Sequence, residues 1–101
     1  MGIRYVALGG YANVGTTRYL TINSSLATRV TLTSGFTAMS VFNQGSASLI
    51  WGDSNITVNS GNYLFPSTRI EWDNVQDGFN IFLVSDSTGY LGIATVNEYR
   101  R

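Results

Sequence analysis

The side chains able to do acid–base chemistry in this sequence are six carboxylates and the tyrosines, because histidine, cysteine and lysine are all absent. Their absence removes Ser-His-Asp and Cys-His nucleophiles, Schiff-base lysines and thiolate zinc sites. Glu71 and Asp73 stand two positions apart in an alternating segment and would share one face of a strand. A glycosidase needs two carboxylates facing each other across a sugar. A chain of 101 residues has little room for such a cleft, so we expect no catalytic residues and no enzyme.

Two segments carry oxygen ligands of the kind that calcium prefers. They are residues 53–55, Asp-Ser-Asn, and residues 73–78, Asp-Asn-Val-Gln-Asp-Gly. Neither has the D-x-[DN]-x-[DN]-G spacing of a calcium loop, and turns require the same residue types for backbone reasons. We interpret both as turns, and we expect no metal and no cofactor.

The aromatic residues, 13% of the chain, are the strongest indication of a binding surface. Exposed rings serve as anchors at interfaces, and they also form the stacking platforms of carbohydrate-binding modules. Trp72 occupies a core-facing position of an alternating segment, so we expect it to be a core anchor. The sequence predicts an outer contact surface that uses five other rings: Tyr5, Tyr11, Tyr19, Trp51 and Tyr90.

The elements that would position these rings are strands. Apolar residues recur at every second position in short runs, and turn residues separate the runs at roughly ten-residue spacing. The expected strands are residues 3–8, 18–22, 28–33, 38–42, 48–51, 56–58, 63–65, 69–73, 79–85 and 90–97. This pattern predicts one all-β domain over residues 1–101, an antiparallel β-sandwich or jelly-roll-like barrel of about 8–10 short strands.

The alternation also predicts which side chains point inward. The expected core consists of Val30, Leu32, Met39, Val41, Leu49, Ile56, Leu64, Ile70, Trp72, Ile81, Leu83, Leu91 and Ile93. A register error of one residue would invert any strand's share of this set. Residues 1–17 are rich in glycine and alternate weakly, so they form either a strand followed by a loop over 9–17 or a peripheral arm.

The surface is unusually poor in charge. Charged residues make up 12% of the chain, against about 25% in an average domain. The net charge is zero, and 11 Ser, 11 Thr and 9 Asn supply the polarity. A neutral surface resists association poorly, and interfaces are depleted in lysine and enriched in arginine, tyrosine and tryptophan. Host compositional bias would give similar numbers; the alternative interpretation is a surface largely covered by partners.

Several partner classes are disfavoured. Zero net charge and the lack of a basic stripe argue against nucleic acid. No 18-residue apolar stretch is present, so we expect no membrane-spanning segment. The N-terminus has no secretory leader pattern, so we do not interpret the sequons at Asn23 and Asn55 as glycosylation sites.

From Ala38 onward the sequence resembles small β-sandwich accessory and decoration proteins of tailed bacteriophages. The segments that carry the resemblance are LIWGDSNITVNSGNYLFP (49–66), TRIEWD (68–73) and FNIFLVSDSTGYLGIATVNE (79–98). A Pro-Gly turn is usual in that pattern, whereas this chain has Pro66-Ser67. The resemblance implies an oligomer, often a trimer, located on a virion shell, and it transfers no catalytic residue.

Two functions follow as expectations. The first is a non-enzymatic virion structural protein, a decoration or head- or tail-associated subunit that self-associates and binds capsid or tail protein. The alternative is a carbohydrate-binding module or receptor-binding domain, whose exposed aromatics, or a groove with Asp and Asn, would contact a glycan.

Overall fold

The computed structural model describes residues 15–86 and 92–100. These residues form strands joined by turns, with no helix among them. The eight strands are β1 (Gly15–Ile22), β2 (Thr28–Thr31), β3 (Ala38–Asn43), β4 (Leu49–Gly52), β5 (Asn62–Leu64), β6 (Arg69–Trp72), β7 (Asn80–Ser85) and β8 (Gly92–Tyr99). The all-β prediction is therefore confirmed.

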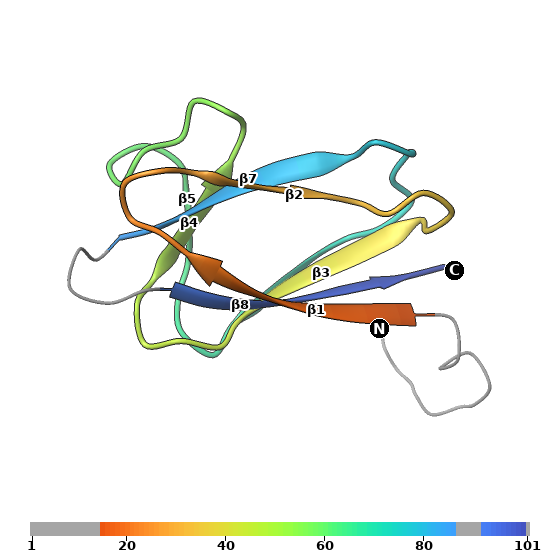
Figure 1. Ribbon diagram of the computed structural model, residues 1–101, viewed down its shortest axis with the longest axis horizontal. Helices are drawn as coiled ribbons and strands as arrows, with labels where there is room; N and C mark the ends of the chain where they lie inside the picture. Colours follow the sequence, from red (N-terminus) through yellow and green to blue (C-terminus); the bar gives the residue numbers. More distant parts are fainter. Residues whose placement is uncertain (1–14, 87–91, 101) are drawn as a thin grey trace.

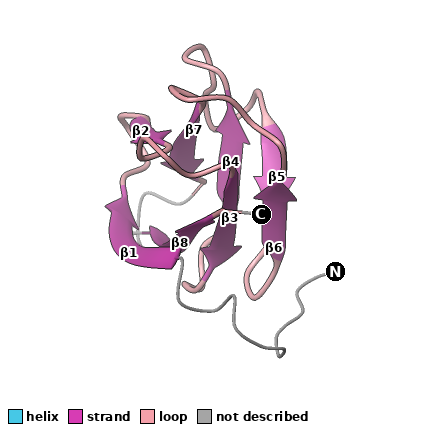
Figure 2. Ribbon diagram, turned by 90° about the vertical axis from the view of Figure 1, so that its right-hand side faces the viewer, coloured by secondary structure: helices cyan, strands magenta, loops and turns pink. Residues whose placement is uncertain are grey.

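The strands form two antiparallel four-stranded sheets that pack face to face. Sheet I has the order β1-β8-β3-β6, and sheet II has the order β2-β7-β4-β5. Figure 1 shows them as two layers, with β2 and β7 of sheet II above β1, β8 and β3 of sheet I. In the turned view, β1 and β2 lie on one side of the sandwich and β5 and β6 on the other (Figure 2).

The connectivity is that of a jelly roll. Strand β1 pairs with β8, β2 with β7, β3 with β6, and β4 with β5, all antiparallel. These four pairs are nested in the sequence, so the chain resembles one long antiparallel hairpin. The additional pairings of β3 with β8 and of β4 with β7 fold this hairpin into two sheets. The two packed sheets confirm the predicted antiparallel β-sandwich, and their strand order is that of a jelly roll.

The core lies between the sheets and consists mainly of aliphatic side chains at alternate strand positions. Its buried members are Ile22, Val30, Leu32, Met39, Val41, Leu49, Leu64, Ile81, Leu83, Ala94 and Val96. Ile70 and Trp72 are half-buried and pack against this cluster, as expected. Ile56 was predicted to join it but is only half-buried and lies outside it, and Leu91 is outside the described residues.

The predicted inward position of Ile93 is wrong, since this side chain is 43% exposed. The inward side of β8 instead carries Gly92, Ala94, Val96 and Glu98, a register one residue away from the expected one. Gly92 has no room for a side chain, because a Cβ there would collide with Leu49 and stand 3.3 Å from the Cβ atom of Ile22. The close approach of the two sheets at this point therefore decides the register.

Two segment boundaries also differ from the sequence prediction. Residues 15–17 were expected to be a loop, but they continue β1, in which Gly15–Ile22 pairs residue by residue with Gly92–Tyr99. Residues 56–58 were expected to be a strand, but they form a turn with a single bridge between Thr57 and Ser60. The hydrophobic residue that suggested this strand, Ile56, packs on Gly52 instead of entering the core.

Candidate functional site

The outer face of sheet I is nearly free of charge. Because successive side chains alternate between faces, the residues opposite the core positions of β1, β8 and β3 point outward. They are Thr17, Tyr19, Thr21, Ile93, Thr95, Asn97, Tyr99, Ala38, Ser40 and Phe42. Charge enters this face only on β6, through Arg69 and Glu71. Thr17, Tyr19, Thr21 and Ile93 are the exposed members of this set, whereas Ala38 and Ser40 are buried, so the exposed part of this uncharged face lies on β1 and β8.

Of the five predicted contact residues, the structure describes Tyr19 and Trp51, and it places these two on different sheets. Tyr5, Tyr11 and Tyr90 lie outside the described residues. Tyr19 stands on the outer face of sheet I and is 71% exposed, so its ring is available to a partner. Trp51, in contrast, is half-buried and packs against the core on the inner side of sheet II.

Trp51 belongs to an aromatic cluster that closes one part of the sandwich. Its ring and that of Trp72, from the opposite sheet, form a T-shaped pair with centroids 5.2 Å apart and an interplanar angle of 83°. Trp72 in turn lies 5.7 Å from Phe79. Aromatic pairs in this edge-to-face arrangement contribute about 0.5–1.5 kcal/mol beyond their burial. Trp51 is therefore mainly a packing residue, and Trp72 has the anchoring position that its sequence context indicated.

The exposed aromatic pair of sheet II was missed by sequence reasoning. Tyr63 of β5 and Phe65 just after it are 56% and 57% exposed, and their rings lie 5.6 Å apart. Leu64 between them is buried, so the alternation places both rings on the outer side of the sheet. The same alternation around Leu64 was the signal in the sequence that could have identified this pair.

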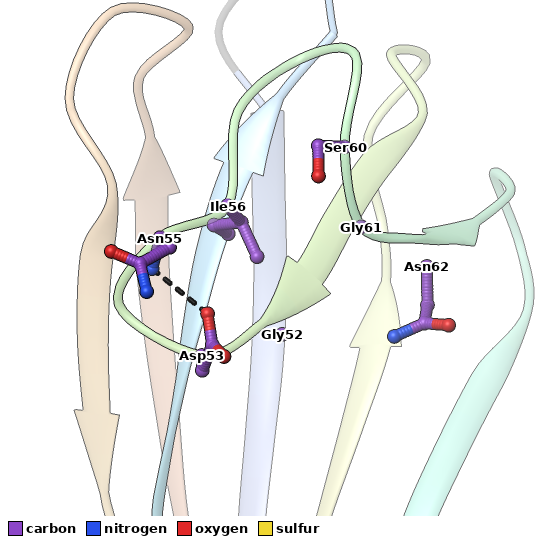
Figure 3. Close-up of a pocket in the computed structure, with 7 residues that line it drawn as sticks. All are labelled: Gly52, Asp53, Asn55, Ile56, Ser60, Gly61 and Asn62. Atoms are coloured by element: carbon purple, nitrogen blue, oxygen red, sulfur yellow. Dashed lines mark hydrogen bonds between the residues drawn. The ribbon is translucent and has the colours of Figure 1, made fainter.

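A polar hollow of about 310 Å³ lies in the loop that joins β4 to β5, and its lining ends at Asn62, the residue before Tyr63. Its lining residues are Gly52, Asp53, Asn55, Ile56, Ser60, Gly61 and Asn62 (Figure 3). Ile50 links the hollow to the aromatic pair, since it contacts Gly61 and stands opposite Tyr63 in the sheet. The volume is at the lower end of the range typical of small-molecule sites.

Hydrogen bonds in the loop and between its flanking strands fix part of this polar lining. One carboxylate oxygen of Asp53 accepts the N–H of Asn55 at 2.9 Å, as drawn in Figure 3. The side-chain amide of Asn62 donates to the carbonyl of Trp51 at 3.3 Å, which leaves its oxygen for another donor. The hollow thus offers one carboxylate, two amide side chains and a hydroxyl around the apolar Ile56. Such groups can bind the hydroxyls of a polar, uncharged ligand.

Glu71 and Asp73, the carboxylates that the sequence placed on one strand face, lie apart from the hollow. Within residues 15–86 and 92–100, no three acidic residues come close enough to hold a metal ion. Glu71 lies on the outer face of sheet I and Asp73 follows the end of β6, and both are exposed. Neither lines the hollow.

Glu98 is a buried carboxylate that sequence reasoning did not single out. It is 1% exposed and accepts four hydrogen bonds at the side of the sandwich where β1 and β2 meet. One oxygen accepts the hydroxyls of Thr16 and Thr33, both at 2.9 Å. The other accepts the Thr33 N–H at 2.6 Å and the Arg18 guanidinium at 3.1 Å. Arg18 also donates to the Thr31 carbonyl of β2 at 3.0 Å, so the cluster joins the two sheets.

The ionisation of Glu98 follows from this environment. Burial raises the pKa of the carboxyl, but the hydrogen bonds from Thr33 and Thr16, together with the charge of Arg18, outweigh burial and hold the pKa below its ordinary value. A carboxylate that stays ionised and already accepts four bonds is poorly suited to act as a general acid. We interpret Glu98 as a cross-link between the sheets.

Comparisons with known proteins return no relatives. No family model, no curated protein and no solved structure matches the chain. In addition, no helix that could cross a membrane occurs in the part of the chain that the structure describes.

Proposed function

We propose that this protein is a non-enzymatic structural subunit of a phage-like virion, a decoration or accessory protein that self-associates and binds capsid or tail protein. The observation that carries the proposal is the uncharged outer face of sheet I, on which the exposed ring of Tyr19 stands. The resemblance to phage accessory sandwiches, which covers the strands from β3 onward, supports the same class.

The fold is compatible with this role. Jelly rolls occur in capsid proteins and also in lectin domains, so the fold is compatible with both functions. The properties of the surface have to distinguish between them. A shell subunit needs a rigid scaffold and a face that does not repel its neighbours. No outward side chain of β1, β8 or β3 carries a charge. Burying this face in an interface would therefore leave no charge without a partner.

Self-association is the first testable consequence. We expect sedimentation velocity to show assembly of the full chain between about 1 and 100 µM. Because the face is uncharged, raising NaCl from about 50 to about 500 mM should leave the association constant nearly unchanged. A protein that remains monomeric at every concentration, or an assembly that salt dissolves, would contradict association through this face.

The virion assignment has a separate test in the genes that flank this one. A major capsid, portal or tail gene beside it is the expected result. A neighbourhood of secreted polysaccharide-degrading enzymes would instead favour the second candidate.

That second candidate is glycan binding, and the hollow of the β4–β5 loop favours it. Asp53, Asn55 and Asn62 supply the hydrogen-bonding groups, and the Tyr63–Phe65 pair supplies an exposed aromatic surface nearby. This combination suits a sugar, because sugars present hydroxyls at their edges and C–H groups on their faces. A receptor-binding subunit of a virion could also use such a site, so the two candidates are compatible.

A printed glycan array provides the test, followed by titration of any sugar that binds. Tyr63→Ala and Asn62→Ala should each weaken binding about tenfold, which corresponds to about 1.4 kcal/mol. Tyr19→Ala removes a more exposed ring from the other sheet and should have no effect. An array without hits, or hits that survive both loop variants, would exclude this site.

A further inference from the structure

Among the described residues, no strand pairs with the outer edge of β1, and the backbone groups on that edge can be identified from the bonds of its neighbour β8. The carbonyls of Tyr99 and Ile93 in β8 accept N–H groups from the β3 side, those of Thr37 and Gln44. In an antiparallel sheet a residue turns its N–H and its C=O to the same side, so the odd-numbered residues of β8 face β3 and the even-numbered ones face β1.

The register of β1 on β8 then decides which of its own groups are used. The residues opposite the even-numbered positions of β8 are Thr16, Arg18, Leu20 and Ile22, and these form the ladder. The residues between them, Thr17, Tyr19 and Thr21, turn their N–H and C=O groups away from β8. No described residue outside the strand ladders bonds to these groups, so the edge is unoccupied within residues 15–86 and 92–100.

The usual protection of an edge strand is missing here. Exposed edges are normally blunted by lysine, proline, a bulge or short length. Strand β1 is eight residues long, pairs without a bulge and contains neither lysine nor proline. Its one charged residue, Arg18, points into the sandwich and is bound to Glu98 and Thr31.

The other three edges are less suitable for pairing. Strand β2 has four residues, and the carbonyl of Thr31 at its end already accepts Arg18. Strand β5 has three residues and is followed by Pro66. Strand β6 has four residues and carries the outward charges of Arg69 and Glu71. Of the four edges in the described structure, β1 therefore presents the longest uninterrupted row of unused groups.

We propose that β1 pairs antiparallel with β1 of a second copy of this chain about a two-fold axis at Tyr19. This inference rests on the proposed self-association and names the segment that carries it. Tyr19 would stand opposite Tyr19 of the second copy, and Thr17 opposite Thr21, so every unused group of the row would find a partner. The two copies of sheet I would become one continuous sheet.

The choice of a second copy as occupant follows from self-complementarity. An antiparallel pair of identical strands exposes the same groups to each other, which is the isologous contact of a two-fold dimer. No outward charge on β1 opposes this contact, and two tyrosines would meet as a cross-strand aromatic pair, a favourable combination. The two-fold arrangement makes a dimer the building unit, whereas the family resemblance implies a trimer.

The sharpest test removes one outward N–H from the full-length protein. Thr21→Pro deletes an N–H that the bond to β8 does not use, and proline is tolerated on an edge strand in that orientation. The monomer should therefore keep its fold by circular dichroism, while the dimer dissociation constant rises at least about tenfold. Thr21→Val retains the N–H with a similar side-chain shape and should dimerise like the wild type.

A charge pair of variants separates the edge from the face of sheet I. Tyr19→Lys would place two like charges opposite each other at the two-fold axis and should abolish the dimer. Ile93→Lys adds the same charge to the same face, one strand away from the edge, and should dimerise normally. If Ile93→Lys dissociates the assembly and Thr21→Pro does not, the contact is the face; the edge proposal then fails while the proposed function stands.

Amide exchange followed by NMR in a dilution series completes the test. The amides of Thr17, Tyr19 and Thr21 should be protected at high concentration and exchange rapidly when the protein is diluted. Protection of the same amides in a concentration-independent monomer would mean that the chain covers its own edge, and it would overturn the proposal. A monomer with rapidly exchanging amides at every concentration would count against both the edge contact and self-association.

Discussion

Replacing Glu98 with alanine is expected to lower the free energy of unfolding by about 3 kcal/mol, the lower end of the range for breaking a buried ion pair. The substitution leaves the N–H of Thr33 and the guanidinium of Arg18 without their acceptor. The loss stays near the lower end because the Arg18 side chain is 37% exposed and can regain water. Urea unfolding followed by tryptophan fluorescence measures this loss, since Trp51 and Trp72 both pack against the core.

Glu98→Gln is the matched control for the loss of charge alone. The amide has nearly the same shape, and the hydroxyls of Thr16 and Thr33 can rotate to accept bonds from its NH₂ group. We expect a loss of about 1–2 kcal/mol, between wild type and Glu98→Ala. Equal stability of Glu98→Ala and the wild type would mean that the four bonds do not hold the sheets together.

The same residue predicts how stability depends on pH. Because the pKa of Glu98 is lower in the folded protein than its ordinary value, the folded state binds its proton less readily than the unfolded chain does. The contribution is therefore complete above the pKa of about 4.3 that glutamate has when unfolded, and it is lost as the pH falls through the lower folded value. Glu98→Gln should show a smaller loss of stability with acid than the wild type.

Asn43→Asp should be at least as damaging, by about 3–5 kcal/mol near neutral pH, because it creates an uncompensated buried charge. Asn43 is fully buried, and its amide donates to the carbonyls of Ala47 and Leu64 at 2.9 and 2.8 Å. An aspartate would turn a carboxylate oxygen toward those two carbonyls. Burial without a cation should raise the pKa of the new carboxyl, so this variant should regain stability as the pH falls, opposite to the behaviour of Glu98.

Asn97→Asp makes the same chemical change on the outer face of sheet I and serves as the control. The side-chain oxygen of Asn97 already accepts the hydroxyl of Thr17 at 2.7 Å, and a carboxylate would accept it equally well. We expect a change within about 0.5 kcal/mol, as for other surface substitutions. If both variants lost the same stability, the damage would come from added negative charge in general and not from the buried acceptors at Asn43.

Much of the fold could be predicted from the sequence, because core positions follow a period of two. Val30 with Leu32, and Met39 with Val41, alternate with polar or smaller residues and were assigned to the core correctly. The exception on β8 is instructive. Its inward side carries a glycine and a glutamate, which look like outward residues, and only the approach of Leu49 and Ile22 to Gly92 explains the register.

The candidate sites were less predictable, because they depend on contacts between distant segments. Glu98 and Arg18 are 80 positions apart, and nothing in either neighbourhood indicates that they meet. The fate of Trp51 also depends on tertiary structure, since only the packing of the two sheets brings it against Trp72. The exposed ring of Tyr19 and the Asp–Asn composition of the β4–β5 loop, in contrast, were visible in the sequence.

The nested pairing of the strands has a consequence for how the polypeptide acquires its shape during synthesis. Thr16 and Glu98, which share a hydrogen bond, are 82 positions apart in the sequence. Strand β1 therefore cannot pair with its neighbour β8 until β8 has been translated. Closing so long a segment is entropically slow, and we expect refolding in the millisecond-to-second range typical of non-local topologies. Until β8 is available, both edges of β1 are unoccupied. We therefore expect the nascent chain to be most prone to aggregate at this stage, with other copies that are being translated from the same mRNA.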